Sequence, residues 1–187
     1  MPEEKRLTDL HPGAGAPAVV NCIVETPKGR RNRYELDKAT GLMKLDKHLF
    51  SASHYPGDYG FVPRTMDADG EPIDVLVMVN EPTFPGCLIE ARVIGGLRLK
   101  ATDRAVDSEG RPAFAGGDYK VLAVPHSDPL CAEFNGVDDV PKHFLREVEH
   151  FFVSYKQIEG VSVEVGAWDS REAAVEAVRQ AMGRGPK

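Results

Sequence analysis

The sequence predicts a mainly β domain, a small barrel or sandwich, with two flanking helices. Many short apolar runs are closed by glycine or proline, two later segments change to helical spacing, and there is no internal repeat. The 42% hydrophobic and 28% charged residues are typical of a globular protein, and 187 residues fit one domain. We therefore expect a single domain at residues 19–187, preceded by an extended arm rich in Pro, Gly and Ala at residues 1–18.

The predicted strands are short runs that end at turn residues such as Thr-Pro, Lys-Gly and Thr-Gly. The stretch at residues 103–118 is polar and glycine-rich between two apolar runs, which predicts a long exposed loop. The expected strands span residues 19–27, 30–37, 41–46, 73–79, 87–99 and 119–125.

The two predicted helices lie near the end of the sequence. Residues 140–160 have apolar side chains at the 0, 4, 7, 8, 11 spacing of one helix face, with Pro141 suited to the first turn and Gly160 just past the end. Residues 168–185 are rich in alanine and close on a glycine, and Asp169 with Glu172 three residues later is suited to cap this helix. The apolar face of the first helix comprises Phe144, Val148, Phe151, Phe152 and Tyr155.

The charge balance and the cysteines restrict the class of protein. A net charge of −6 argues against a protein that binds nucleic acid through its phosphates. No window approaches the roughly 18 apolar residues of a membrane span, and no signal peptide is recognisable. Cys22, Cys87 and Cys131 are odd in number and widely spaced, which fits reduced thiols. We expect a cytoplasmic protein without nucleic-acid or membrane partners.

Four acids crowd the stretch Asp-Ala-Asp-Gly-Glu-Pro-Ile-Asp at residues 67–74, immediately before an apolar run. Carboxylate oxygens of this kind hold hard divalent cations such as Mg²⁺. In a regular strand Asp74 would point away from Asp69 and Glu71, but Gly70 and Pro72 break the regularity, so a turn or bulge would allow all three to converge. A solvated acidic turn is the alternative interpretation.

A calcium-binding EF-hand loop does not fit this stretch. Its glycine falls at the fourth loop position rather than the sixth, and the twelfth position is Met78. An apolar β-run also follows where the second helix should begin.

Other ionic residues are spaced for one face of a strand. Asp118 and Lys120 stand two residues apart at the start of a predicted strand, and so do Arg33 and Glu35. Asp103 opens the polar loop that Asp118 closes. Because alternating ionic residues are also typical of the solvent-facing side of a sheet, each pair alone has two interpretations.

Phenol and ammonium groups stand at two further places. Tyr55 and Tyr59 lie in a turn-rich stretch, and Tyr155 with Lys156 ends the first helix. Such groups can donate to phosphate oxygens, whereas a ring at the edge of the core and an exposed helix end are the alternative roles.

Six motifs in this order resemble the soluble family I inorganic pyrophosphatases over nearly the whole chain beyond the arm. They are IVETP, RYELD, HYPGDYGFVP, DGEPIDVLV, the block from Asp103 to DYKVLAVP, and HFFVSYK, of which DGEPIDVLV is the most specific. The resemblance implies a five-stranded OB-like closed barrel with flanking helices that hydrolyses pyrophosphate to two phosphates. It also implies several Mg²⁺ ions in a carboxylate-lined cavity, with Mn²⁺ or Zn²⁺ as substitutes, and a homohexamer.

The resemblance assigns roles by position. Pyrophosphate is strongly negative, so metal ions would bridge it to the protein and lower the pKa of the attacking water towards ~7. Asp74 would bridge two metals, and Glu71 stands where the water-orienting base is found. The metal ligands would be Asp69, Asp74, Asp103, Asp118, Glu25 and Glu35. The substrate-binding residues would be Arg33, Lys47, Tyr59, Lys120, Tyr155, Lys156 and Tyr55.

The sequence departs from the usual family pattern in three respects. Glu71 replaces an Asp, and its longer side chain would displace the carboxylate by roughly 1.5 Å, where a misplacement of about 1 Å can cost ~10²-fold in rate. Arg33 and Lys47 stand where the family usually has Lys and then Arg, which keeps the charge but changes the geometry. The loop at residues 103–118 is also longer than usual.

Two alternative functions follow. A slowed homologue would bind pyrophosphate or phosphorylated metabolites without fast turnover, because of these departures. An OB-type nucleic-acid-binding module is compatible with the strand pattern, but the acidic balance weighs against it.

Overall fold

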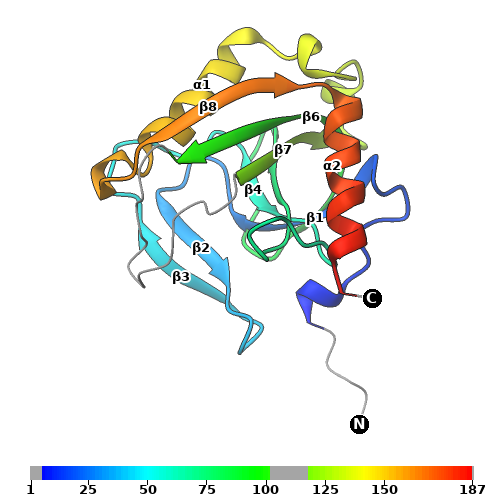
Figure 1. Cartoon of the computed structure of the whole chain (residues 1–187), viewed down its shortest axis with the longest axis horizontal. Helices are drawn as coiled ribbons and strands as arrows, with labels where there is room; N and C mark the ends of the chain where they lie inside the picture. Colours follow the sequence, from blue (N-terminus) through cyan, green and yellow to red (C-terminus); the bar gives the residue numbers. More distant parts are fainter. Residues whose placement is uncertain (1–5, 102–117, 187) are drawn as a thin grey trace.

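The computed structural model describes residues 6–101 and 118–186 (Figure 1). Within them the chain forms eight strands, two α-helices and four short 3₁₀ helices. The strands are β1 (Val19–Thr26), β2 (Asn32–Leu36), β3 (Met43–His48), β4 (Asp58–Phe61), β5 (Asp74–Val77), β6 (Leu88–Ala101), β7 (Asp118–Pro125) and β8 (Val163–Asp169). The α-helices are α1 (Lys142–Ser154) and α2 (Arg171–Arg184), and the 3₁₀ helices span Leu7–Asp9, Pro129–Cys131, Val137–Asp139 and Gln157–Glu159.

Five of the strands close into a ring. The hydrogen-bonded order is β1-β4-β5-β7-β6, and β1 also pairs with β6, so the first and last strands meet. β8 pairs with the outer edge of this order at β6, while β2 and β3 form a separate two-stranded sheet. The expected five-stranded closed barrel is therefore confirmed.

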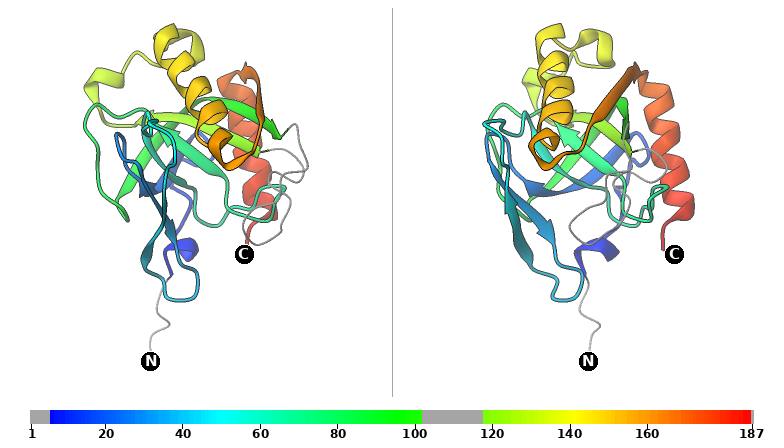
Figure 2. Two further views of the ribbon diagram at one scale, coloured as in Figure 1. Left: turned by 90° about the vertical axis from the view of Figure 1, so that its left-hand side faces the viewer. Right: turned by 60° about the vertical axis from the view of Figure 1, so that its left-hand side comes forward.

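The two sides of the ring strands pack into two apolar clusters. Successive side chains of a strand point to opposite faces, so Val75 and Val121 join one cluster whereas Leu76 and Leu122 join the other. The first cluster includes residues of α2, and the second includes residues of α1. Figures 1 and 2 show the two helices on different sides of the strands. Because both faces are covered, β5 and β7 read as continuous apolar runs.

β5 and β7 run parallel, whereas the other pairings within the ring are antiparallel. Asp74 and Asp118 are the first residues of these two strands. The parallel pairing therefore brings both carboxylates to the same end of the ring, with Asp74 opposite Lys120.

The expected strands are present, and the structure adds two others. β4 and β8 are strands that the turn-based reading of the sequence left out. β4 lies very close to β1, since a Cβ atom added at Gly60 would lie 1.9 Å from the carbonyl oxygen of Ile23. Glycine is required at this position, and its presence concealed the strand.

The expected helices are present with different ends. α1 ends at Ser154 rather than near Gly160, which instead ends the short 3₁₀ helix in a left-handed conformation with φ of 80°. The capping residue of α2 is Ser170, whose side chain accepts a hydrogen bond from the N–H of Ala173. Asp169, the expected cap, is the last residue of β8.

The described part of the N-terminal segment lies against the ring. The N–H of Asn21 donates to the carbonyl of Pro12 at 2.7 Å, and the N–H of Val93 donates to the carbonyl of Ala18 at 3.0 Å. The division of the chain at residue 18 stays a prediction.

Candidate active site

The centre of the site is Lys120, held between two carboxylates at the start of β5 and β7. Its Nζ contacts Oδ2 of Asp74 and lies 2.6 Å from Oδ1 of Asp118. Asp118 and Lys120 are two residues apart on β7 and so share a face, while the pairing with β5 brings Asp74 alongside. The side chains of Lys120, Asp118 and Asp74 are 6%, 12% and 28% exposed, so the ammonium is largely shielded from water while Asp74 keeps some access to it.

An aromatic wall completes the surroundings of Lys120. Its Nζ lies 5.5 Å from the centre of the Tyr59 ring and 6.0 Å from that of Phe152. The phenol of Tyr59 donates a hydrogen bond of 2.7 Å to Oδ2 of Asp74. Burial and the neighbouring Asp74 raise the pKa of Tyr59 well above its usual value, so the phenol keeps the proton that it donates.

The buried charges of this cluster shift one another's pKa. Burial by itself would lower the pKa of Lys120, but Asp118 and Asp74 outweigh it and raise the value, so the ammonium is retained. Burial raises the pKa of Asp118, Lys120 opposes this, and Asp74 and Asp69 raise it further. The negative charges therefore lie close enough to repel one another, and positive charge stabilises them.

Asp69 reaches the cluster from a tight turn ahead of β5. Gly70 adopts a φ of 86°, a conformation that glycine takes readily, and the N–H of Glu71 donates to Oδ1 of Asp69 at 2.9 Å. The N–H of Asp67 donates to the carbonyl of Glu71 at 2.6 Å and closes the turn. Partial burial, and then the charge of Asp74, raise the pKa of Asp69.

Glu71 does not join Asp69 and Asp74. Its carboxylate forms an ion pair with Lys38, which lies between β2 and β3, and both side chains are 58% exposed. The turn that brings Asp69 towards the cluster directs the longer Glu71 side chain to the surface. Of the three acids, Asp69 and Asp74 are thus near enough to interact electrostatically whereas Glu71 lies at the surface, and the site roles of all three stay predictions.

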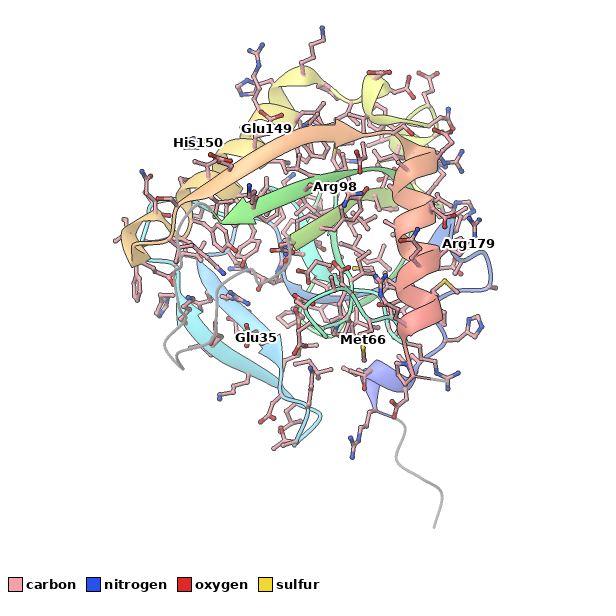
Figure 3. All side chains as sticks on the ribbon, viewed as in Figure 1. Glu35, Met66, Arg98, Glu149, His150 and Arg179 are labelled. Carbon is pink, nitrogen blue, oxygen red and sulfur yellow. The ribbon has the colours of Figure 1, made fainter. Side chains whose placement is uncertain are left out.

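Glu25 and Glu35 occupy different environments. Burial raises the pKa of Glu25 to about 7, although the N–H of Leu36 donates to its Oε1 at 2.9 Å and opposes the shift. Glu35 lies on β2, is 45% exposed and pairs with Arg33 (Figure 3). Glu25 thus resembles the buried acids of the cluster, whereas Glu35 anchors a cation.

Two cations on the β2–β3 sheet are each held by an acid. Arg33 lies directly opposite Lys47 in the strand register, and its Nε is 3.5 Å from Oδ2 of Asp46. Nζ of Lys47 lies 2.7 Å from Oε2 of Glu159. These pairings fix the direction of both side chains, although their two acids were not found in the sequence analysis.

The other two candidate tyrosines, Tyr55 and Tyr155, lie in the same region as Lys156. The ring of Tyr55 lies 5.4 Å from that of Tyr59, and burial raises the pKa of Tyr55 to about 12. Tyr155 is buried and stacks on Phe151 at 5.0 Å. Burial, followed by the charges of Arg33 and Lys120, lowers the pKa of Lys156 to about 8. The candidate cations therefore lie near enough to repel one another.

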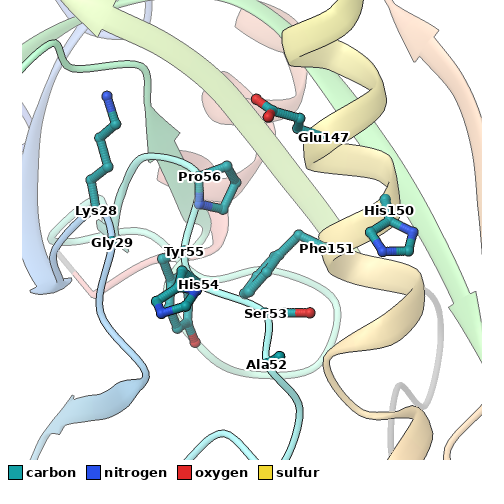
Figure 4. Close-up of a pocket in the computed structure, with 10 residues that line it drawn as sticks. All are labelled: Lys28, Gly29, Ala52, Ser53, His54, Tyr55, Pro56, Glu147, His150 and Phe151. Carbon is teal, nitrogen blue, oxygen red and sulfur yellow. The ribbon is translucent and has the colours of Figure 1, made fainter.

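A cavity of about 570 Å³ lies beside this region, between α1 and the loop before β4 (Figure 4). His54 and Tyr55 line it from the loop, and Glu147, His150 and Phe151 line it from α1. Of the candidate residues that the structure describes, Tyr55 alone takes part in its lining. The cavity is thus separate from the carboxylate cluster.

The acids form a donor set that suits a hard cation. Among residues 6–101 and 118–186, no three acidic, His or Cys side chains are close enough to hold a metal ion as they stand. Lys120 contacts two of the expected ligands, and Asp103 lies outside the described residues. However, Asp69, Asp74 and Asp118 are oxygen donors whose mutual repulsion a cation relieves, so the residues present fit Mg²⁺.

The partners that sequence reasoning missed come from remote segments. Lys38, Asp46 and Glu159 pair with Glu71, Arg33 and Lys47 respectively. Asp46 carried a local signal, since the β2–β3 register places it next to the residue opposite Arg33. Lys38 and Glu159 carried none, because their partners lie 33 and 112 residues away in the sequence.

Comparisons with known proteins give the family of the chain. A family model described as inorganic pyrophosphatase matches residues 22–185. An inorganic pyrophosphatase from Halalkalibacterium halodurans is 43% identical over 168 residues, covering 90% of this chain and 96% of the relative. One from Methanosarcina acetivorans is 43% identical over 166 residues, covering 89% and 92%. The crystal structure of inorganic pyrophosphatase from Thermus thermophilus has a TM-score of 0.87 at 38% identity, covering 96% of this chain and 98% of that one. The chain belongs to the inorganic pyrophosphatase family.

Proposed function

We propose that this inorganic pyrophosphatase hydrolyses pyrophosphate to two orthophosphates with Mg²⁺ held by the acids at the start of β5 and β7. The observation that carries the proposal is the cluster of Asp74, Asp118 and Lys120, in which a buried cation already lies between two carboxylates. Two carboxylates that stabilise one positive charge can also stabilise a metal ion. The chain has the fold of a family that hydrolyses pyrophosphate.

The metal site would be built on Asp74, with Asp69 and Asp118 beside it and Glu25 on β1, which pairs with β4 and β6. Divalent cations supply a lowered pKa for the attacking water and neutralise charge on the phosphates. Tyr59 orients one oxygen of Asp74 through its hydrogen bond, which leaves Oδ1 free of that contact. Asp103 belongs to the proposed set by its position in the family motif. Mg²⁺ is the proposed metal, with Mn²⁺ and Zn²⁺ as substitutes.

The cations opposite the acids would hold the substrate. Arg33 offers a planar fork to two phosphate oxygens, whereas Lys47 and Lys156 are point charges. The proposed ligands also include the phenols of Tyr55 and Tyr155. Arg33 and Lys47 are already directed by acidic partners, so substrate would find them in place and exchange one anion for another.

Glu71 is the proposed acceptor of the proton from the attacking water. Because its carboxylate pairs with Lys38 at the surface, this role requires the side chain to turn inwards. The same pairing favours a second candidate function, a pyrophosphatase of reduced turnover. The nucleic-acid-binding alternative has no comparable support, since the family is one of hydrolases.

The proposed setting is the cytoplasm, with the chain assembled as a homohexamer. The described residues contain no helix that is long and apolar enough to cross a membrane. A relative from rice that is 42% identical is named a soluble inorganic pyrophosphatase. The hexamer rests on the family resemblance, and the molar mass in solution would test it.

Phosphate release from pyrophosphate, measured with Mg²⁺ and with a chelator, tests the proposal. We expect turnover with Mg²⁺ only. Replacing Asp74 with Asn should lower the rate more than ~100-fold, because loss of even an outer-shell partner costs ~10–100-fold. The exposed Asp138 provides the matched control, and Asp138→Asn should keep the wild-type rate. A wild-type rate in folded Asp74→Asn would refute the proposed site.

A further inference from the structure

We propose that Lys120 is a built-in cation that competes with the metal for Asp74 and Asp118, so that metal binding and release of the Lys120 ammonium are one exchange. The inference rests on the proposed metal site and goes beyond it, since it makes Lys120 a positioning residue for the metal as well as a ligand of substrate. Its basis is the contact of one ammonium with both carboxylates.

The ammonium is fully occupied where it stands. A lysine has three N–H donors, and two of them are directed at Asp74 and Asp118. The remaining side faces aromatic rings, with the centres of Tyr59 and Phe152 at 5.5 and 6.0 Å. Nζ therefore lies where a cation shared by the two carboxylates would lie.

The two cations cannot share this position. A divalent ion bound by these two carboxylates would lie close to an ammonium that contacts both of them, and the two would repel each other strongly because little water screens the ammonium. The backbone of Lys120 is fixed by its pairing with β5, but its side chain has a flexible four-carbon stem. The stem allows the ammonium to move away from the carboxylates while the strand stays in place.

The exchange links the metal to the substrate. In this structure the ammonium of Lys120 is paired with the two acids and does not point towards an external anion. A metal that takes over the acids would free the ammonium for phosphate oxygens. Lys120 would then be available to bind pyrophosphate only when the metal is bound.

Isothermal titration calorimetry of the metal-free protein with Mg²⁺ tests the competition without any turnover. Lys120→Met keeps an apolar stem against Tyr59 and Phe152 and removes the charge. We expect it to bind Mg²⁺ more tightly than the wild type, by on the order of tenfold or more. Lys120→Arg retains the charge and should not show this gain.

A second lysine whose ammonium is held by hydrogen bonds provides the matched control. Nζ of Lys28 donates to the carbonyls of Val79 and Asn80 at 3.0 and 3.1 Å and contacts no expected metal ligand. Lys28→Met should therefore leave the affinity for Mg²⁺ unchanged. Equal or weaker Mg²⁺ binding by Lys120→Met than by the wild type would overturn the inference.

A measurement on the wild type covers the case in which Lys120→Met does not fold. The ammonium of Lys120, observed by NMR with ¹⁵N-lysine labelling, should shift in proportion to Mg²⁺ bound at the site. An unchanged signal at saturating Mg²⁺ would refute the exchange. The two proposals fail separately: if the wild type binds Mg²⁺ and Asp74→Asn abolishes this, the metal site stands even when the Lys120 signal does not move. If the wild type binds no Mg²⁺, both are wrong.

Discussion

The lowered pKa of Lys156 predicts a loss of substrate affinity in mildly alkaline solution. Burial and the charges of Arg33 and Lys120 lower this pKa to about 8. The side chain is then about 90% charged at pH 7 and about 10% charged at pH 9. Because the proposed contact with pyrophosphate uses the ammonium form of Lys156, substrate binding must restore the proton at the higher pH.

The size of the effect follows from the pKa. Restoring the proton at pH 9 to a lysine with a pKa of about 8 costs roughly tenfold in affinity, or about 1.4 kcal/mol. Lys156→Arg keeps its charge throughout this range and serves as the matched control. The titration of the substrate and of the metal is common to both proteins, so it cancels in their ratio.

The assay is the dissociation constant of a non-hydrolysable pyrophosphate analogue at saturating Mg²⁺, measured for both proteins between pH 7 and 9. We expect the affinity of the wild type to fall about tenfold relative to Lys156→Arg over this range. A ratio that does not change with pH would show that Lys156 does not contact the substrate as an ammonium, or that it is not desolvated.

The same pKa also predicts how Lys156 affects stability. The unfolded chain has the ordinary lysine value of 10.5, so between pH 8 and 10.5 it binds more protons at this residue than the folded chain. The contribution of Lys156 to the free energy of unfolding therefore rises with pH across that window. Denaturant unfolding of the wild type and Lys156→Arg, compared at several pH values, measures the difference.

Three further predictions concern the base and the core. Glu71→Asp restores the usual family residue and should raise kcat, because the shorter carboxylate cannot extend to Lys38; a fall would show that the site has adjusted around Glu71. Lys38→Met should raise kcat/KM by less than about fivefold, since an exposed pair is worth at most ~1 kcal/mol. A kcat/KM below that of the wild type would contradict the idea that Lys38 keeps Glu71 away from the site. Phe152→Ala should lower the melting temperature by about 10 °C, because Phe152 is fully buried and such truncations cost about 3–5 kcal/mol; an unchanged value would refute its place in the core.

The parts of the site that follow from strand geometry were predictable from sequence. The side-chain period of two places Asp118 and Lys120 on one face, and the structure joins them. The order of the motifs also predicted the closed barrel. The pairing of Asp74 with Lys120 was not predictable in this way, because periodicity does not reveal that β5 and β7 are parallel neighbours.

Contacts between remote surface segments were not predictable. The position of Glu71 depends on where the β2–β3 connection brings Lys38, and no local pattern encodes that. β8 was missed although its start alternates Val163, Glu164 and Val165, because its last two residues were assigned to the helix expected over residues 168–185. The α2 helix instead begins at Arg171, after the strand has ended.

The parallel alignment of β5 and β7 makes the chemistry depend on residues that never meet a ligand. Sliding β7 by two positions would preserve which side chains face inwards, yet it would move Lys120 about 6.6 Å along the strand from its position opposite Asp74. The fit of Val121 and Leu122 against their neighbours on β5 opposes such a slip, as does the antiparallel pairing of β7 with β6. Variants that loosen this fit should therefore lose catalysis at temperatures where the fold still survives.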